Sequence, residues 1–572
     1  MGKIDLVIRG GTIADGTGGD LREADIAVNE GRIVEVGKFT DTGHEEVDAR
    51  GLLVTPGFID VHTHYDGQLT WSDQLNPSSD HGVTTVVAGN CGVGFAPCRD
   101  GDRDNLIRLM EGVEDIPELV MSDGLPWDWK SFPDFLDSIE SKPHDIDFAM
   151  LFPHSPLRVF VMGNRALDLE PATDADKARM RQLTREAVEA GAIGFGTSRS
   201  IFHKASDGGL IPSVSAEISE LVEIAGGLAD AGRGTFQAVT SSRTPSVDDY
   251  LLFHEVARQS GRPLTYTLLQ FNAPHMADIW KQVMDAVERD RAEGLDIRPQ
   301  VFNRPVGNIL GLDASFNPFC MHPYYVEHLA HLSFEDRVAE MRKLEVRAKL
   351  IKPQGEMKLA HRGTLRQFGE MYPMGEFADY EPDPSTSVEA TAKARGITPD
   401  EVAYDLLLER DGRGKLLMAL SNFAAGNLDA TLDLMKRQET VLALGDGGAH
   451  YGVICDATYS TYTLTHWARD RKRERLDIPT AVKMLTDQPA RLHRFRDRGR
   501  IAPGMKADIN VIDMDRLKLY SPTVVHDLPG GGKRLTQKAD GYVATFVGGT
   551  AIRRNGTDTG ARPGRLVRDA GI

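Results

Sequence analysis

Apolar runs alternate with helical stretches along most of this chain. Such runs are typical of buried parallel strands, and the segments between them are long enough for crossover helices. The runs lie near residues 57–64, 83–90, 147–153, 191–197, 234–240, 263–270, 297–303 and 440–446. Eight strand–helix units predict an α/β fold in which residues 57–496 form a (β/α)8 TIM-like barrel. Between the fourth and fifth runs, Leu221 and Leu228 belong to a helical stripe that Ser213 or Ser215 can cap.

Both ends of the chain show a different pattern, of short strands and tight turns. Residues 24–28 and 32–36 flank a turn at Asn29-Glu30-Gly31, which is typical of a β-hairpin. The C-terminal end repeats the pattern at 507–512 and 542–547. We therefore expect one small β-sandwich domain built from residues 1–56 together with 497–572.

The stretch from about 304 to 440 is too long for a single connection between two strands. It includes a Pro- and acid-rich piece at residues 380–385. We expect an inserted lid or subdomain over the mouth of the barrel, the end at which barrel enzymes place their sites.

Composition narrows the classes of partner and location. The 572 residues are 41% hydrophobic and 26% charged, as in an ordinary globular protein. The formal net charge of −18 argues against nucleic acid or an anionic membrane surface as a partner. The N-terminus enters a strand pattern at once, and the four cysteines show no Cys-x-x-Cys spacing. We expect a cytoplasmic protein with neither a signal peptide nor a membrane span.

The first apolar run, beginning Gly57-Phe58-Ile59, ends in His62-Thr63-His64. Residues i and i+2 of a strand point to the same face, so His62 and His64 would project together. Two adjacent imidazoles form half of a metal site, although such a pair near a turn can also be a hydrogen-bonded surface feature. Far downstream, another apolar run ends in Gly445-Asp446-Gly447-Gly448, which places a carboxylate among glycines. Together these motifs predict a metal-activated water with an aspartate beside it.

These motifs, together with Thr486-Asp487-Gln488-Pro489-Ala490 and residues 499–508, resemble the amidohydrolase superfamily. The segment 84–92, which ends Gly89-Asn90-Cys91-Gly92, is similar to the D-aminoacylase (N-acyl-D-amino-acid deacylase) branch. The resemblance implies a zinc-bearing barrel, a β-sandwich from both termini, hydrolysis of an amide and a homo-oligomer. It also implies that Cys91 stands where many relatives use a carboxylated lysine to bridge metals.

The chain departs from that branch at several positions. Relatives carry metal-binding histidines at the ends of the fifth and sixth strands, whereas this chain has Phe236-Gln237-Ala238-Val239 and residues 264–268 without histidine. One zinc ion is therefore expected, and a second is left open. No arginine follows Asp446 closely, and Phe302-Asn303-Arg304-Pro305 replaces a tyrosine-containing pattern. A preference for N-acetyl D-amino acids is therefore not carried over to this chain.

We predict that His62, His64 and Asp446 hold the metal, with Cys91 as a further ligand or as a bridge to a weaker second ion. Asp446 would accept the water proton and deliver it to the leaving nitrogen. His203 would polarise the substrate carbonyl or replace a missing ligand, the alternative being a solvated loop histidine. Arg199 can hold a carboxylate bidentately. The residues expected to contact substrate are Arg199, Ser198, Gln237, Arg304 and His450.

The favoured hypothesis is a zinc-dependent hydrolase whose substrate is a small-molecule amide, either an N-acyl amino acid or a bulkier amide. A hydrolase of cyclic amides or of esters is the nearest alternative, because the same metal–water chemistry serves all of them. A non-enzymatic scaffold that has lost part of the metal site is the second alternative. Metal content separates the scaffold from the enzymes.

Overall fold

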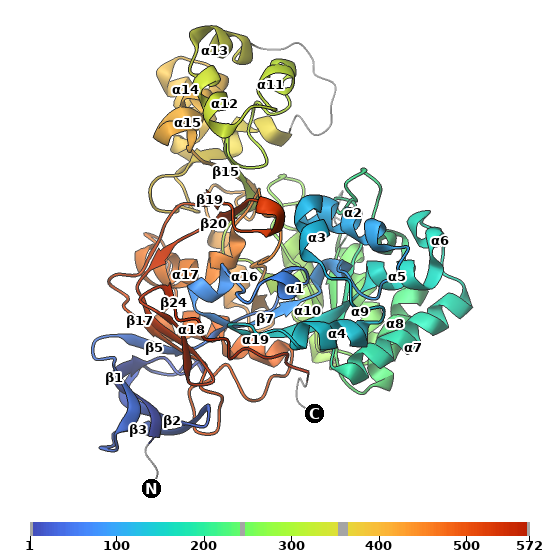
Figure 1. Ribbon diagram of the computed structural model, residues 1–572, viewed down its shortest axis with the longest axis vertical. Coiled ribbons are helices and arrows are strands. Elements are labelled where there is room, and N and C mark those ends of the chain that lie inside the picture. The colour runs from blue at the N-terminus through green and yellow to red at the C-terminus, as the bar shows by residue number, and fades with distance from the viewer. Residues whose placement is uncertain (1–3, 241–245, 353–363, 569–572) are drawn as a thin grey trace.

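The central part of the molecule is a parallel sheet of six strands, in the order β11-β10-β9-β8-β7-β6. The computed structural model, shown in Figure 1, describes residues 4–240, 246–352 and 364–568. The six strands are β6 (Phe58–Asp60), β7 (Val83–Ala88), β8 (Asp147–Pro153), β9 (Gly194–Ser198), β10 (Thr235–Val239) and β11 (Leu264–Tyr266). Every residue of β6, β7, β8 and β9 is buried, which is why these strands read as mostly apolar runs.

A second parallel pair continues this arrangement. It consists of β12 (Gln300–Val301) and β16 (Val441–Leu442). Parallel bridges from Leu264 to Ile297 and from Thr267 to Gln300 connect β11 with the segment of β12. All eight apolar runs thus overlap a strand, and the predicted mixed α/β fold is confirmed.

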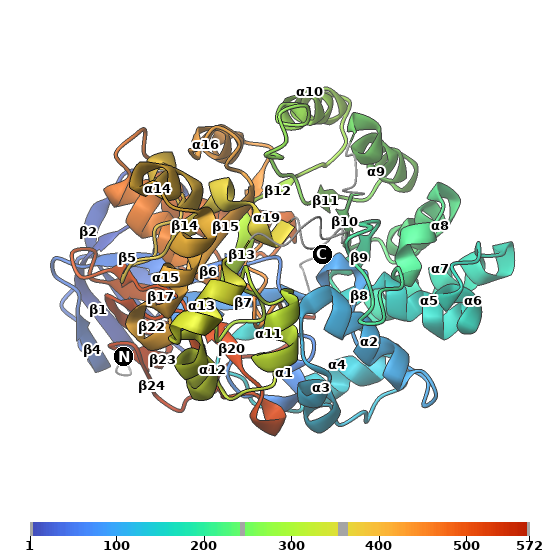
Figure 2. The same cartoon turned by 90° about the horizontal axis from the view of Figure 1, so that it is seen from above.

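Helices follow the strands and lie along their outer side, as Figure 2 shows for β8 to β11. These helices are α7 (Asp174–Ala190), α8 (Ile218–Asp230), α9 (Val247–Ser260) and α10 (Ile279–Ala292). Leu221 and Leu228 of α8 are buried, as its stripe predicted. The predicted serine cap is wrong, because Glu217 occupies the N-cap and the Ser213 hydroxyl instead donates to the Ser198 carbonyl at 2.8 Å.

Shorter helices fill the connections near the first strands and on both sides of β16. The first group is α1 (Gln68–Trp71), α2 (Arg103–Glu114), α3 (Glu118–Gly124), α4 (Phe132–Glu140), α5 (His154–Met162) and α6 (Asn164–Leu167). The later helices are α16 (Asp429–Lys436), α17 (Tyr459–Tyr462), α18 (Ile478–Leu485) and α19 (Asp487–Leu492). Within the described ranges, no helix is both long enough and apolar enough to cross a membrane.

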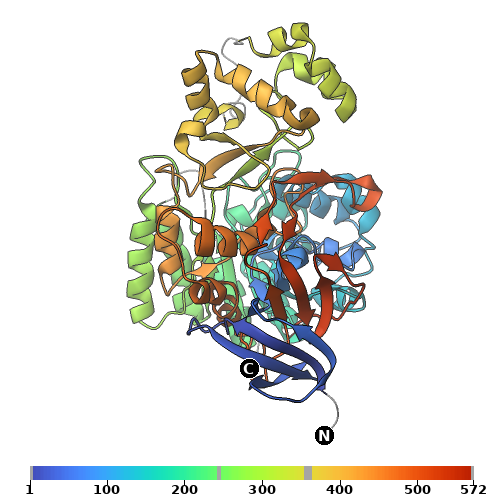
Figure 3. The ribbon, with the colours of Figure 1, turned by 90° about the vertical axis from the view of Figure 1, so that its left-hand side faces the viewer.

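Strands from both ends of the chain share a nine-stranded sheet, whose N-terminal strands lie at the bottom of Figure 3. The N-terminal strands are β1 (Ile4–Ile13), β2 (Arg22–Asn29), β3 (Arg32–Gly37), β4 (Gly43–Asp48) and β5 (Leu53–Pro56). The C-terminal strands are β17 (Ile509–Ile512), β22 (Tyr542–Val547), β23 (Thr550–Arg554) and β24 (Thr557–Asp558). The two groups meet where β5 pairs antiparallel with β17, and Ile8, Val511 and Phe546 belong to one shared core. The predicted hairpin is confirmed, because Asn29 pairs with Arg32 across a two-residue turn.

The long stretch before β16 builds a unit with its own core, at the top of Figure 1. Its antiparallel sheet has the order β13 (Val306–Leu310), β15 (Leu416–Ser421) and β14 (Met371–Pro373). Its helices are α11 (Pro323–His328), α12 (Phe334–Met341), α13 (Leu344–Leu350), α14 (Val388–Arg395) and α15 (Pro399–Gly412). Two backbone bonds tie this unit to the segment after β16, from Ile309 N–H to Val453 O and from Ser315 N–H to Gly452 O.

Glu381 joins this unit to the segment that follows α17. Its two carboxylate oxygens each accept a hydrogen bond of 2.8 Å from the Arg471 guanidinium, and His466 Nε2 lies 2.8 Å from Oε2. Burial alone would raise the pKa of Glu381, but the bonds from Arg471 and His466 outweigh it and lower this pKa to about 2. The ionised carboxylate is therefore strongly favoured in the folded protein.

We predict that Glu381→Gln destabilises the protein by about 3 kcal/mol near neutral pH, because the buried Arg471 then keeps only Asp429, 2.7 Å from its Nη2, as a counter-charge. The pKa of Glu381 is lower in the folded than in the unfolded chain. Its stabilisation is therefore complete above the unfolded value of about 4.3 and is lost as the pH falls towards 2. Urea unfolding of both proteins should show a difference that shrinks below about pH 4. A constant difference at all pH values would contradict the prediction, and exposed Glu376→Gln serves as the matched control.

Candidate metal and catalytic site

His62 and His64 lie directly after β6 and are buried, with 2% and 1% of their surfaces exposed. An acceptor stands on the Nδ1 side of each ring. Gln300 Oε1 lies 2.6 Å from His62 Nδ1, and Glu114 Oε1 lies 3.4 Å from His64 Nδ1. On the other side, the two Nε2 atoms lie 3.4 and 3.6 Å from Asp446 Oδ1. Both imidazoles therefore direct the same nitrogen towards one point.

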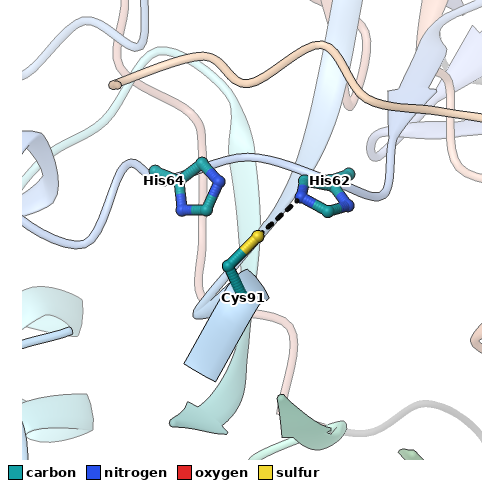
Figure 4. Close-up of side chains that lie close together, drawn as sticks. All are labelled: His62, His64 and Cys91. Atoms are coloured by element: carbon teal, nitrogen blue, oxygen red, sulfur yellow. Dashed lines mark hydrogen bonds between the residues drawn. The ribbon is translucent and has the colours of Figure 1, made fainter. Parts of the chain in front are cut away.

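Cys91 completes this group from the turn after β7 (Figure 4). Its Sγ atom lies 3.3 Å from His62 Nε2. One ligand atom from each of His62, His64 and Cys91 can be chosen so that all three lie within 4.8 Å of one another. The Cys91 N–H donates to Gln237 Oε1 at 3.1 Å, which fixes the turn against β10. The next residue, Gly92, has to be a glycine, because a Cβ atom there would lie 2.7 Å from Thr197 Cα.

Asp446 reaches the group from the loop that follows β16. Its backbone N–H donates to the His62 carbonyl at 3.0 Å, and His62 N–H in turn donates to Asp60 Oδ1 at 3.1 Å. Among the described residues, the buried Asp446 Oδ1 has no hydrogen-bond partner. A carboxylate oxygen in this state, facing two ring nitrogens, is suited to a cation between them.

The buried charges of the site favour a positive charge at its centre. Burial lowers the pKa of His62 to about 4 and raises that of the Cys91 thiol to about 12. Burial would also lower the pKa of His64, but Glu114 and Asp446 outweigh it and raise this pKa well above its ordinary value. Burial would raise the pKa of Asp446, but the adjacent His64 and His62 rings hold it far below its usual range. The acidic groups around His64 thus stabilise one cation, whether a proton or a metal ion.

The donor set fits zinc. Two imidazoles, a thiol that can ionise on a metal and a carboxylate are the ligand types that zinc takes in proteins. Gln300 Oε1 at His62 Nδ1 and the Glu114 carboxylate 3.4 Å from His64 Nδ1 favour protons on these two nitrogens. The Nε2 lone pairs would then be free for a metal, which is the usual arrangement of metal-ligating histidines.

Three further predicted residues lie around this group. Gln237 supports the Cys91 turn, and His450 Nε2 lies 3.4 Å from Glu114 Oε2. Burial, together with the charges of His450 and His64, lowers the pKa of His203 to about 3. The Nδ1 atom of His203 is buried and lacks a hydrogen-bond partner within the described part of the chain.

Ser198, Arg199 and Arg304 are held by other groups. Ser198 is buried, and its carbonyl and hydroxyl oxygens accept hydrogen bonds from neighbouring residues. Arg199 donates to the Ala216 carbonyl. Arg304 is fully buried, and its Nη2 donates to Asp456 Oδ1 at 2.9 Å. Roles for these three residues as substrate contacts stay predictions.

Two residues beside the histidines were not anticipated from the sequence, Glu114 and Gln300. Glu114 is 1% exposed and ends α2, where it shares a helical stripe with the buried Ile107 and Met110. A carboxylate in an apolar stripe is a pattern that could have singled it out. Gln300 is likewise a polar residue within an apolar run and is completely buried.

Comparison with known proteins identifies the class of this chain. Residues 45–552 match the amidohydrolase family, and the chain belongs to that family.

Individual relatives carry deacylase names. The chain is 37% identical over 223 residues to N-acyl-D-aspartate deacylase of Alcaligenes xylosoxydans xylosoxydans, a match that covers 39% of this chain and 40% of the relative. The chain thus aligns with about two fifths of the length of that relative. N-acyl-D-glutamate deacylase of the same organism is 24% identical over 577 residues, which cover 100% of this chain and 98% of the relative.

A solved structure has a similar fold. It is N-acyl-D-glutamate deacylase from Bordetella bronchiseptica complexed with zinc and a phosphonate inhibitor. Its TM-score is 0.64 at 21% identity, with 99% of this chain and 100% of that chain covered.

We predict that Gly445→Ala disrupts the site. A Cβ atom at this position would lie 1.8 Å from Asp60 Oδ2, and Asp60 holds the His62 backbone. Overpacking of this kind costs about 1–3 kcal/mol. The thermal unfolding midpoint should therefore fall, whereas Gly101→Ala, whose Cβ meets nothing within 4 Å, should leave it unchanged. Equal midpoints for both variants would contradict the prediction.

Proposed function

We propose that this protein is a zinc-dependent hydrolase that cleaves the carbon–nitrogen bond of a small-molecule amide, an N-acyl amino acid or a bulkier amide. The observation that carries the proposal is the convergence of His62, His64, Cys91 and Asp446 on one point. Family membership and the deacylase names of the relatives support the reaction class.

His62, His64 and Cys91, with Asp446, would hold one zinc ion. When bound, zinc supplies a water of lowered pKa and polarises the carbonyl of the substrate. Whether a second ion binds stays an open question, because β10 and β11, the strands of Gln237 and Thr265, carry no histidine.

Asp446 is proposed to move the proton of the reaction. Its Oδ1 would accept the proton from the attacking water and then donate it to the leaving nitrogen. His203, whose Nδ1 lacks a described partner, would polarise the carbonyl through a neutral ring N–H. Substrate contacts are proposed for Arg199, Ser198, Gln237, Arg304 and His450.

Cyclic amides and esters are the alternative substrates. They would need the same water, carboxylate and carbonyl polarisation, so the residues described do not separate them from linear amides. A panel of N-acyl amino acids, hydantoins and simple esters would distinguish these substrates by relative kcat/KM.

We also propose that β6–β12 and β16 close as a TIM-like barrel over residues 57–496, with 304–440 as a lid and 1–56 plus 497–572 as a separate β domain. Backbone bonds from Asp446 N–H to His62 O and from His64 N–H to Gly447 O support closure between the first and last strands.

We also propose a cytoplasmic homo-oligomer that binds no nucleic acid. The four cysteines are free, as is usual in a reducing compartment, and the net charge is −18. The oligomer is expected from the family resemblance alone.

Protein purified without chelators should contain about one zinc ion per chain, measured by inductively coupled plasma mass spectrometry. His62→Ala/His64→Ala should lose this zinc, whereas the exposed pair His44→Ala/His526→Ala should retain it. No bound metal, and no activity after zinc is added, would favour the scaffold alternative instead.

Asp446→Asn should lower turnover of an amide substrate by about 10²–10⁴-fold, because the amide cannot accept the water proton. Zinc should still bind through His62, His64 and Cys91. Steady-state kinetics with metal analysis in parallel tests this, with exposed Asp433→Asn as the control. Near-normal turnover of a metal-loaded Asp446→Asn enzyme would exclude the proposed role.

A further inference from the structure

A buried carboxylate from outside the strands lies between two histidines of the site. Glu114 ends α2, and its Oε1 lies 3.4 Å from His64 Nδ1 while its Oε2 lies 3.4 Å from His450 Nε2. Neither oxygen has a hydrogen-bond partner among the described residues, although the side chain is 1% exposed. Burying an ion without compensation is costly, so a carboxylate kept here points to a cation or a charged donor beside it.

We propose that Glu114 is a positioning residue that orients His64 towards the metal and sets the affinity for zinc. The inference rests on the proposed function, since it concerns the same metal site. The Glu114 carboxylate, 3.4 Å from Nδ1, favours the proton on that nitrogen, so that the Nε2 lone pair of His64 would face Asp446 and the other ligands.

The two histidines have acceptors of different chemistry. Gln300 offers His62 a neutral amide oxygen at 2.6 Å, whereas Glu114 offers His64 a carboxylate. A carboxylate withdraws the Nδ1 proton more strongly and makes the imidazole a better electron donor to a metal. The electron donation from His64 to the metal should therefore depend more on Glu114 than the donation from His62 depends on Gln300.

The end of α2 is anchored independently of the Glu114 side chain. The Glu114 carbonyl accepts the His450 N–H, and Asp115 Oδ2 accepts from Gly452 N–H at 3.0 Å and from the Ser315 hydroxyl at 3.2 Å. These contacts hold the loop after Asp446 even when the Glu114 carboxylate is replaced. The effect of the Glu114 carboxylate on zinc binding can therefore be separated from the effect of the contacts between the end of α2 and the loop after Asp446.

The experiment measures zinc affinity by competition with a chromophoric chelator, for the full-length protein and three variants. Glu114→Gln keeps the shape but removes the charge, Glu114→Leu removes the acceptor, and Asp115→Asn is the control at the same junction. We expect zinc binding to weaken about tenfold in Glu114→Gln and up to about 100-fold in Glu114→Leu, with Asp115→Asn close to wild type. Cobalt-loaded protein gives a second readout, because the thiolate-to-cobalt absorption of Cys91 should persist while the ligand-field bands shift in the Glu114 variants.

Each outcome decides the question. If Glu114→Leu binds zinc as the wild type does, or if Asp115→Asn weakens binding equally, the positioning role is overturned and the proposed function stands. If the wild type binds no zinc, both proposals fail together. Circular dichroism verifies folding, and if Glu114→Leu does not fold, wild-type affinity in the near-isosteric Glu114→Gln overturns the inference.

Discussion

The site depends on the direct pairing of two segments that are far apart in the chain. Asp446 N–H donates to His62 O at 3.0 Å, and His64 N–H donates to Gly447 O at 2.7 Å. Buried backbone groups must find partners, so these two bonds fix where each segment lies relative to the other. The backbone therefore positions the ring nitrogens of His62 and His64 and the carboxylate of Asp446, independently of contacts between these side chains. The glycines follow from the same constraint, because a Cβ atom at Gly448 would lie 2.7 Å from the His64 carbonyl.

This pairing concentrates unfavourable features in a small volume. Cys91, Asp446 and His450 all have positive φ values, of 56°, 46° and 51°, which are uncommon for residues with side chains. Burial raises the pKa of Asp60 to about 8, with the nearby charge of Asp446 adding to the effect. Strained backbone and crowded acids persist only where the surrounding structure holds them in place. A cation at the centre would relieve the acids, which is why the geometry and the electrostatics support the same ligand set.

Much of this arrangement could be predicted from the sequence where periodicity carries the information. The eight strands were recognisable because their residues are buried on both faces, and His62 and His64 because a strand repeats every two residues. Cys91 and the choice of zinc came from the family resemblance. The helix cap was misplaced because the serines that precede α8 bond elsewhere.

Tertiary contacts explain what the sequence did not reveal. Glu114 enters the site from a helix, so only the packing of α2 against the loop after β16 places it beside His64. The ion-pair partner of a buried arginine cannot be predicted from the sequence either, as the pair of Arg304 with Asp456 shows. Periodicity reports which face of an element is buried, but it does not report which distant element covers that face.

The loop after β16 connects the site to two different parts of the molecule. At its start, residues 446 and 447 are bonded to His62 and His64. At its end, residues 450–453 are bonded to the end of α2 and, through Ile309 and Ser315, to the inserted unit. Each end of the loop thus has its own anchors: Asp446 is bonded to the segment of His62, and His450 is bonded to the end of α2. The position of His450 therefore depends on the packing of α2 and the inserted unit, whereas the position of Asp446 depends on the segment that carries His62.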